Sequence, residues 1–143
     1  MILTDVNVLV YAHRADAPGH AAYRAWLEAV LNGDQAYGVS DLILQGFLRV
    51  ATHPRVFSPP SDLATALAFA EMLRSQPNAV PIAPGPRHWN IFTGLCQAAA
   101  VKGNLVPDAY PAALAIESGS EWITTDRDFS RFPGLRWRHP LDG

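Results

Sequence analysis

Four aspartates in this sequence have the side chain and the placement for shared chemistry. Asp5 ends a short apolar run, Asp108 opens a helical stretch after a proline, and Asp126 and Asp128 follow the apolar residues EWI. Four carboxylates in one place would repel one another strongly unless a divalent cation neutralised them. Oxygen ligands suit the hard ions Mg²⁺ and Mn²⁺ better than zinc. The four residues therefore raise the hypothesis of a metal site, which their spacing alone does not prove.

Three of the four acids also have a structural interpretation. Asp108 after Pro107 is a typical helix N-cap, and Asp126 and Asp128 would stabilise the start of a short helix through its dipole. Asp5 has no obvious structural task. A carboxylate with apolar neighbours on both sides costs on the order of several kcal/mol unless something compensates its burial.

Strands and helices alternate along the chain. Short apolar runs predict strands at 1–5, 36–40 and 121–126, an extended segment within 76–86 and an edge strand near 135–138. Apolar residues at helical spacing predict helices at 20–31, 41–53, 61–74 and 87–102, with Ser40 as the N-cap of the second. A further helix begins at Asp108 and has Pro111 in its first turn. A short helix or loop precedes the expected edge strand near 135–138. The expected strand and core residues near the N-terminus are Ile2, Leu3, Val6, Val8, Leu9 and Val10.

This alternation predicts an α/β fold, with a parallel sheet covered by helices. The chain has 143 residues, 49% of them hydrophobic and 17% charged, and shows no repeat or linker, so we expect a single domain over residues 1–143. Ligands in such folds bind beyond the carboxyl ends of the strands. That rule points to Asp5, to Asp41 after the second strand, and to the TTD at 124–126.

Composition and charge exclude several classes of function. A net charge of −2 gives no overall attraction to nucleic acid or to an acidic membrane, so any such binding must be local. No apolar run approaches the length of a membrane span, and the N-terminus lacks the features of a signal peptide, so we expect a cytoplasmic protein. Cys96 is the only cysteine and is typical of a small core residue, and the five histidines lack zinc-site spacing.

Three stretches of the chain, in this order, resemble a known family. They are LTDVNVLVYAH at 3–13, GFLRVATHPRVF at 46–57 and PDAYPAALAIESGSEWITTDRDFSRFPGLRW at 107–137. Their order, spacing and total length are similar to those of the PIN-domain ribonucleases, in particular the toxins of VapBC-type toxin–antitoxin pairs. The second stretch resembles a group of these toxins that is abundant in mycobacteria.

The resemblance implies a three-layer α/β/α sandwich with a central parallel sheet, and a metal-dependent endoribonuclease. By position, Asp5, Asp108 and Asp126 match the acids that would hold Mg²⁺ or Mn²⁺, and Asp128 adds an acid from the same loop. Asn7 matches a polar residue that supports the first acid. The candidates for hydroxyl hydrogen bonds to these acids are Thr4, Thr124 and Thr125.

One acid that many relatives carry is missing from this sequence. They place a glutamate in the helix after the second strand, where this chain has Gln45 and Gly46. Asp41 lies one helical turn before Gln45, so its carboxylate would either reach the same site as a substitute or act only on the helix dipole. Without a substitute, we expect activity to be weaker, more demanding of metal, or absent.

The reaction that the resemblance implies is hydrolysis of an RNA phosphodiester, with transfer RNA or ribosomal RNA loops as targets. A bound Mg²⁺ would lower the pKa of a water, and Asp41 or Asp128 would orient that water or complete a second metal site. Flanking phosphates would bind to basic side chains on either side of Asp128, namely Arg127 and Arg131, with Arg14 and Arg49 as further candidates earlier in the chain.

The resemblance also implies two protein partners, a VapB-like antitoxin and a second copy of the chain. We expect their contacts on the apolar surface of residues 62–73 and of the helix at 20–31. Ordinary core packing is the alternative for both stretches.

Three other functions stay open at this level. A phosphohydrolase of the HAD type also has a strand-end aspartate, but it needs a second acid two residues later, where this chain has Asn7. A receiver domain needs a late lysine, whereas Lys102 precedes Asp108 and Asp126. A PIN fold that binds antitoxin or RNA without cleaving is the stronger alternative, because the glutamate is missing.

Overall fold

The structure, a computed structural model, describes residues 1–142. Its strands are β1 (Ile2–Thr4), β2 (Tyr37–Val39), β3 (Ala79–Pro81), β4 (Glu121–Ile123) and β5 (Trp137–Arg138). Its α-helices are α1 (Val6–His13), α2 (His20–Asn32), α3 (Asp41–Ala51), α4 (Leu63–Arg74), α5 (His88–Ala98) and α6 (Val106–Ser118). Two short 3₁₀ helices, η1 (Gly103–Leu105) and η2 (Arg127–Arg131), lie before α6 and after β4.

All the strands lie parallel in one sheet, in the order β3-β2-β1-β4-β5. Leu3 in the central strand lies opposite Gly38 of β2 and Trp122 of β4. The Asp5 N–H continues the pairing with β4 by donating to the Ile123 carbonyl oxygen at 2.8 Å. Because β1 and β4 are neighbours, the residues that follow them leave the sheet side by side at its carboxyl edge.

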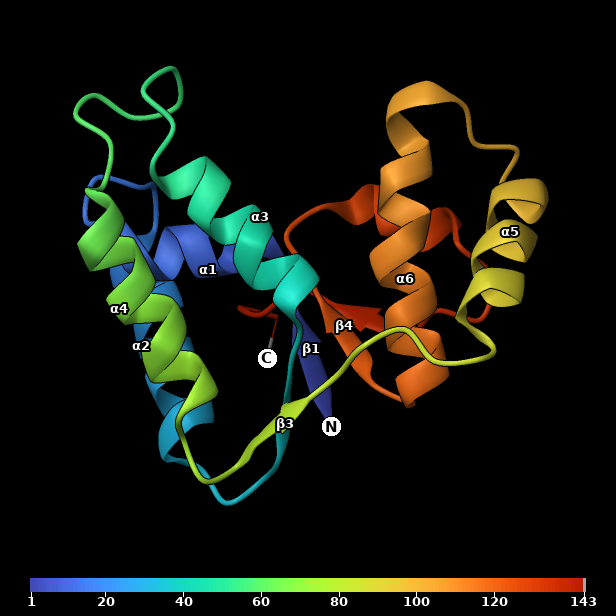
Figure 1. Ribbon diagram of the computed structural model, residues 1–143, viewed down its shortest axis with the longest axis horizontal. Coiled ribbons are helices and arrows are strands. Elements are labelled where there is room, and N and C mark those ends of the chain that lie inside the picture. Colours follow the sequence, from blue (N-terminus) through green and yellow to red (C-terminus); the bar gives the residue numbers. More distant parts are fainter. Residues whose placement is uncertain (143) are drawn as a thin grey trace.

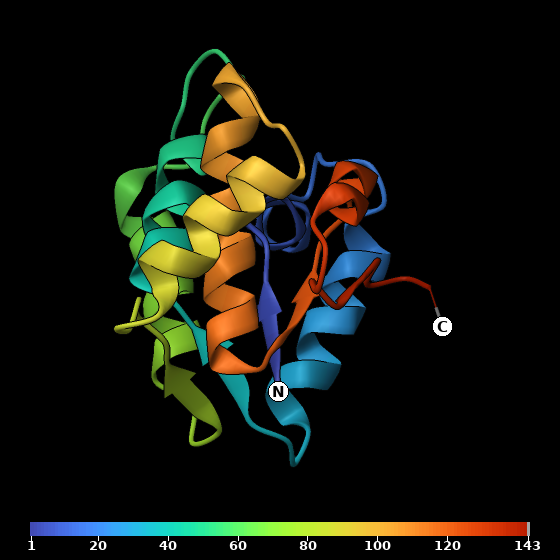
Figure 2. The ribbon, with the colours of Figure 1, turned by 90° about the vertical axis from the view of Figure 1, so that its right-hand side faces the viewer.

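Helices cover both faces of this sheet. Figure 1 shows α1 to α4 on one side of the strands and α5 and α6 on the other, and Figure 2 shows the second pair in front of the strands. The first four helices connect β1, β2 and β3, and the last two carry the chain back past β1 to β4. The α/β fold with a parallel sheet that we predicted is therefore confirmed.

The first strand is shorter than expected, and the apolar residues after it form helix α1. Asp5 is the N-cap of this helix, and its Oδ1 atom accepts a hydrogen bond from the Val6 N–H at 2.7 Å. Val8 and Val10 pack into the core, as predicted, but from a helix and not from a strand. Although the predicted strand ended at Asp5, we also expected apolar residues within 6–10 to have strand character, which was wrong. Valines at alternate positions favour strands, whereas the cap and tertiary packing select the helix here.

The boundaries of helices α5 and α6 also differ from the prediction. Helix α5 ends at Ala98, before the expected end at Lys102. Helix α6 begins at Val106, so Pro111 lies inside it and not in its first turn. Ser40 occupies the N-cap position of α3 as expected, but its side chain makes no capping hydrogen bond.

One hydrophobic core joins the sheet to the helices on both faces. The largest fully buried side chains include Trp122 of β4, Phe47 of α3 and Leu3 of β1. Cys96 is half-buried and packs against this core. No helix within residues 1–142 has the length and apolar character needed to cross a membrane.

Candidate active site

Asp5 lies between β1 and α1 at the carboxyl edge of the sheet, and each of its carboxylate oxygens has a hydrogen-bond donor. Oδ1 accepts from the Val6 N–H at 2.7 Å, and Oδ2 accepts from the Thr124 hydroxyl, also at 2.7 Å. Thr124 directly follows β4 and is fully buried. These two bonds supply part of the compensation that a carboxylate in apolar surroundings requires.

The remaining cost of burying Asp5 appears in its pKa. Burial raises the pKa of Asp5 to about 6 although the two hydrogen bonds lower it, and the carboxylates of Asp108 and Asp126 raise it further. The pKa of Asp108 is also raised, first by burial and then by repulsion from Asp126 and Asp128. The structure therefore brings Asp5, Asp108 and Asp126 within range of mutual repulsion, and places Asp128 within range of Asp108.

Thr124 connects two of these acids. Its Oγ1 atom donates to Asp5 and also accepts a hydrogen bond from the Asp126 N–H at 3.0 Å. The Oδ1 atom of Asp126 accepts from the Asp128 N–H at 2.9 Å and so caps η2. One buried hydroxyl thus fixes the first acid relative to the loop that carries Asp126 and Asp128.

Three other polar residues that the sequence singled out make no hydrogen bond to the acids. Asn7 lies in the first turn of α1, where its Oδ1 atom is buried without a hydrogen-bond partner among residues 1–142. The side chains of Thr4 and Thr125 likewise form no hydrogen bond within the part of the chain that the structure describes. The hydrogen bond from Thr124 to Asp5 is one that we expected, whereas the support expected from Asn7 comes instead from the Val6 N–H.

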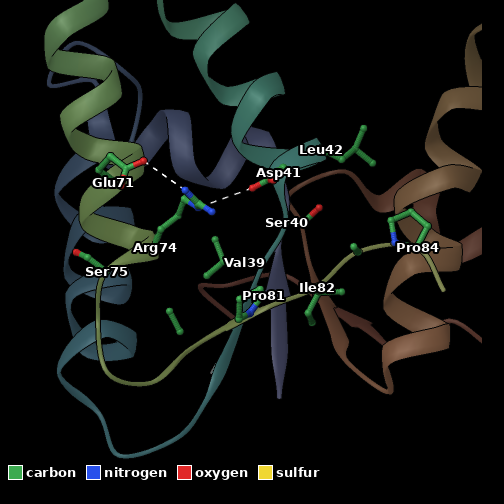
Figure 3. Close-up of a pocket in the computed structure, with 12 residues that line it drawn as sticks. Val39, Ser40, Asp41, Leu42, Glu71, Arg74, Ser75, Pro81, Ile82 and Pro84 are labelled. Carbon is green, nitrogen blue, oxygen red and sulfur yellow. Dashed lines mark hydrogen bonds and ion pairs between the residues drawn. The ribbon is translucent and has the colours of Figure 1, made fainter.

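The structure does not bring Asp41 to the other acids. Its side chain, in the first turn of α3, is 89% exposed, and its Oδ1 atom lies 3.7 Å from Nε of Arg74 in α4. Figure 3 shows the Arg74 side chain between Asp41 and Glu71, at the rim of a groove of about 420 Å³ that α3, α4 and the β2–β3 edge line. These observations favour the alternative interpretation of Asp41, a first-turn acid, here paired with an arginine.

Packing explains the glycine at position 46, where the resemblance leads us to expect a glutamate nearby. A Cβ atom at Gly46 would lie 2.9 Å from Cγ2 of Val6, so only glycine permits this approach of α3 to the start of α1. Gln45, the residue before it, is exposed. Neither position sets an acid beside Asp5.

The arginines expected to bind phosphate fall into two groups. Arg14 and Arg127 each form an ion pair with an acid, at 2.7 Å and 3.6 Å, and are therefore poorer candidates than we expected. Arg49 and Arg131 have neither an acidic partner nor a side-chain hydrogen bond among residues 1–142. Arg131 lies near enough to Asp108 to oppose the rise in the pKa of that acid.

The acids have the chemistry for a hard divalent ion, but they do not form a finished set of ligands. Within residues 1–142, no three His, Cys, Asp or Glu side chains are arranged so that they could hold one ion. Oxygens of Asp5 and Asp126 instead face backbone and hydroxyl donors. The fit to Mg²⁺ or Mn²⁺ therefore rests on the all-oxygen donors and on the mutual repulsion of the acids.

Known proteins with similar sequences identify the family. Residues 2–135 match the family model of the PIN domain. This chain belongs to the PIN-domain family. Its PIN-domain relatives include Ribonuclease VapC43 of Mycobacterium tuberculosis, 47% identical over 143 residues that cover all of this chain and 97% of that protein. Ribonuclease VapC25 of the same organism is 42% identical over 140 residues, which are 98% of this chain and 99% of that protein. The resemblance to mycobacterial VapC proteins is thereby confirmed.

Solved structures of less similar proteins share the fold. VapBC2 from Rickettsia felis, bound to a DNA fragment from its promoter, aligns with a TM-score of 0.71 at 18% identity, over 97% of this chain and 98% of that chain. VapC20 of Mycobacterium tuberculosis, described as a sarcin-ricin loop cleaving toxin, aligns with a TM-score of 0.64 at 15% identity, over 95% and 99%. At such low identity, these likenesses concern the fold alone.

Sequence reasoning missed one contributor to the PIN-domain site, the Val6 N–H at the start of α1. An aspartate directly before an apolar run is an N-cap pattern, so the signal was present. It was outweighed by the strand-like valines that follow.

Proposed function

We propose that this chain is a metal-dependent endoribonuclease toxin of a toxin–antitoxin pair, which hydrolyses phosphodiester bonds of transfer or ribosomal RNA in the bacterial cytoplasm. The observation that carries this proposal is the mutual repulsion of Asp5, Asp108 and Asp126 near the carboxyl ends of β1 and β4. It occurs in a chain that is 47% identical over its whole length to a protein named as a ribonuclease.

The three carboxylates of Asp5, Asp108 and Asp126 would hold Mg²⁺ or Mn²⁺, which supplies a water of lowered pKa and polarises the phosphate when bound. Asp5 and Asp108 must be ionised for this role, and a cation beside them favours ionisation because it offsets their repulsion. Thr124 would keep the Asp5 carboxylate directed toward the loop of Asp126. Asp128 is the acid that remains to orient the attacking water.

Arg131 is the expected phosphate contact nearest to the acids. It is exposed at the end of η2, and its positive charge acts to lower the pKa of Asp108. A guanidinium at this position would bind a phosphate oxygen beside the reacting one and offset the acidic centre.

We further propose a VapB-like antitoxin as partner and a homodimer as the state of the chain. Leu63 and Leu67, one turn apart on α4, are 60% and 43% exposed. A groove of about 250 Å³ runs between α2 and α4 and is lined in part by Leu27, Leu31, Phe69 and Met72. An amphipathic helix fits such a surface, and the solved relatives include toxin–antitoxin complexes.

A second candidate is a PIN fold that binds antitoxin or RNA without cleaving. The ion pair between Asp41 and Arg74 favours it, because no acid replaces the missing glutamate. The absence of a finished set of metal ligands within residues 1–142 points the same way.

One assay separates the two candidates. The purified full chain, free of antitoxin, is incubated with labelled transfer RNA with and without Mg²⁺ or Mn²⁺. We expect cleavage only with the ion, loss of cleavage in Asp5→Asn, and full cleavage in Asp34→Asn, a matched change in an exposed loop. Asn at position 5 keeps an oxygen for the Val6 N–H. Equal cleavage by Asp5→Asn would exclude the proposed site, and RNA binding without cleavage under every condition would support the second candidate.

A further inference from the structure

Most basic side chains of this protein are already satisfied by acceptors on its own surface. Five arginines form ion pairs with acids within residues 1–142: Arg14, Arg24, Arg74, Arg127 and Arg138. Two more donate hydrogen bonds to backbone carbonyl oxygens: Arg87 and Arg136. The remaining basic residues have neither kind of partner in the part of the chain described, and all are exposed: Arg49, Arg55, Lys102 and Arg131.

These four unpaired cations lie on segments at one end of the molecule. Arg49 is in the last turn of α3, Arg55 in the connection 52–62 between α3 and α4, Lys102 between α5 and η1, and Arg131 at the end of η2. Figures 1 and 2 both show the α3–α4 connection and the start of α6 at the end toward which β1 points. The acids that follow β1 and β4 leave the sheet in the same direction.

The α3–α4 connection, which carries Arg55, is held in a defined shape. Arg14, at the end of α1, donates to the Pro59 carbonyl oxygen at 2.9 Å and to the Ser61 hydroxyl at 3.2 Å. Its guanidinium also lies 4.2 Å from the centre of the Phe57 ring. The connection therefore presents Arg55 from a preorganised backbone, which reduces the entropy lost when a ligand binds.

Helix α1 lies between the first acid and Arg14, the residue that holds this connection. Helix α1 separates Asp5 from Arg14 and has 8 residues, which corresponds to roughly 12 Å. A phosphate chain that reaches the acids would be repelled there and needs cations on either side of them. With a net charge of −2, the protein offers no general attraction that could replace such local contacts.

We propose that these four cations form the RNA-backbone contact of the protein. Arg49 and Arg55 bind phosphates on the α3 side of the acids, and Lys102 and Arg131 bind phosphates on the side of α6 and η2. The contact is electrostatic and independent of base sequence. The chemical class of the ligand rests on the proposed function, whereas the choice of residues rests on the distribution of paired and unpaired cations.

Fluorescence anisotropy with labelled transfer RNA tests this contact in the full chain, in EDTA so that metal-dependent cleavage does not consume the probe. Arg55→Gln and Lys102→Gln should each weaken binding several-fold and reduce the slope of log K against log salt concentration by roughly 0.7 to 0.9. Arg24→Gln is the matched control, because Arg24 pairs with Glu28 at 3.0 Å on α2. It should leave both affinity and slope unchanged.

An unchanged affinity and slope in a chain with both Arg55→Gln and Lys102→Gln would overturn the proposal. A chain that binds no transfer RNA at low salt would overturn it as well. Circular dichroism shows whether each variant is folded, which the exposed positions lead us to expect. The anisotropy assay measures binding and not cleavage. If the unmodified chain cleaves no RNA, but Arg55→Gln and Lys102→Gln still weaken binding, the result would support this contact and contradict the proposed nuclease activity.

Discussion

The Thr124 hydroxyl donates a hydrogen bond to Oδ2 of Asp5 at 2.7 Å, across 119 residues of sequence. The parallel pairing of β1 with β4, in which Thr4 lies opposite Ile123, brings the two residues together at the end of the sheet. The same hydroxyl accepts from the Asp126 N–H at 3.0 Å. The position of Asp5 relative to Asp126 therefore depends on one buried oxygen atom.

Removal of this hydroxyl should lower both stability and activity. Thr124→Val keeps the shape of the side chain but leaves Oδ2 of Asp5 and the Asp126 N–H without their hydrogen-bond partner. We expect a free energy of unfolding lower by about 1–3 kcal/mol and slower metal-dependent cleavage, measured by urea denaturation and initial rates. Thr124→Ser, which retains the hydroxyl, should recover most of the activity. A valine variant as stable and active as the unmodified chain would contradict this role.

The raised pKa of Asp5 predicts a pH-dependent cost of folding in the metal-free chain. The folded pKa is about 6 and the ordinary value is 3.8, so the folded chain retains a proton that the unfolded chain loses as the pH rises above about 4. The stability contributed by Asp5 should fall from pH 4 to pH 6 and stay low at pH 7. The total change is at most about 3 kcal/mol.

Asp5→Asn should remove this part of the pH dependence, because it has no proton to lose, and Asp34→Asn should retain it. The measurement is urea denaturation in EDTA at several pH values between 4 and 7. If the unmodified chain and Asp5→Asn lose stability in parallel over that range, Asp5 is not the titrating group.

Asp41 should be dispensable for cleavage. Its carboxylate pairs with Arg74 and is largely exposed, so Asp41→Asn should change stability by less than about 1 kcal/mol and leave the cleavage rate unchanged. Asp108→Asn, a change in the first turn of another helix, should abolish cleavage. A large loss of rate in Asp41→Asn would reinstate Asp41 as the substitute for the missing glutamate.

The stability of the protein should be sensitive to the addition of a single methyl group at Gly46. In Gly46→Ala the new Cβ would lie 2.9 Å from Cγ2 of Val6, so α3 must move away from α1. We expect a loss of about 1–3 kcal/mol in the free energy of unfolding, measured by urea denaturation. Gly94→Ala is the matched control within a helix, because nothing lies within 4 Å of its Cβ position. Equal stability of Gly46→Ala and the unmodified chain would show that α1 and α3 pack less tightly than the 2.9 Å approach indicates.

The sequence contains enough information for the alternation of strands and helices, because short apolar runs and helical spacing are local patterns. It was misleading after Asp5, where Val6, Val8 and Val10 have the spacing of a strand. The competing signal, an aspartate that caps a helix, became decisive only through packing of α1 against the core. Local propensity and tertiary context conflict at this one place.

The candidate site could be predicted only in part. Strand ends and helix starts at the carboxyl edge are visible in the sequence, and the structure brings Asp5, Asp108 and Asp126 near enough to repel one another. Asp41 pairs with Arg74 because the end of α4 packs beside the start of α3. No local sequence pattern predicts how these two helices pack. The bond from Thr124 to Asp5 likewise depends on strand order.

The most direct test of a shared centre is the initial rate of Mn²⁺-dependent cleavage of labelled transfer RNA by four proteins: the unmodified chain, Asp5→Asn, Asp108→Asn and the double variant. Groups that act as one unit give losses that do not multiply. We expect each single variant to lose about 10²-fold or more, and the double variant to be no slower than the slower single one. A single variant that cleaves at nearly the unmodified rate, or losses that multiply in the double variant, would contradict a common metal-dependent centre.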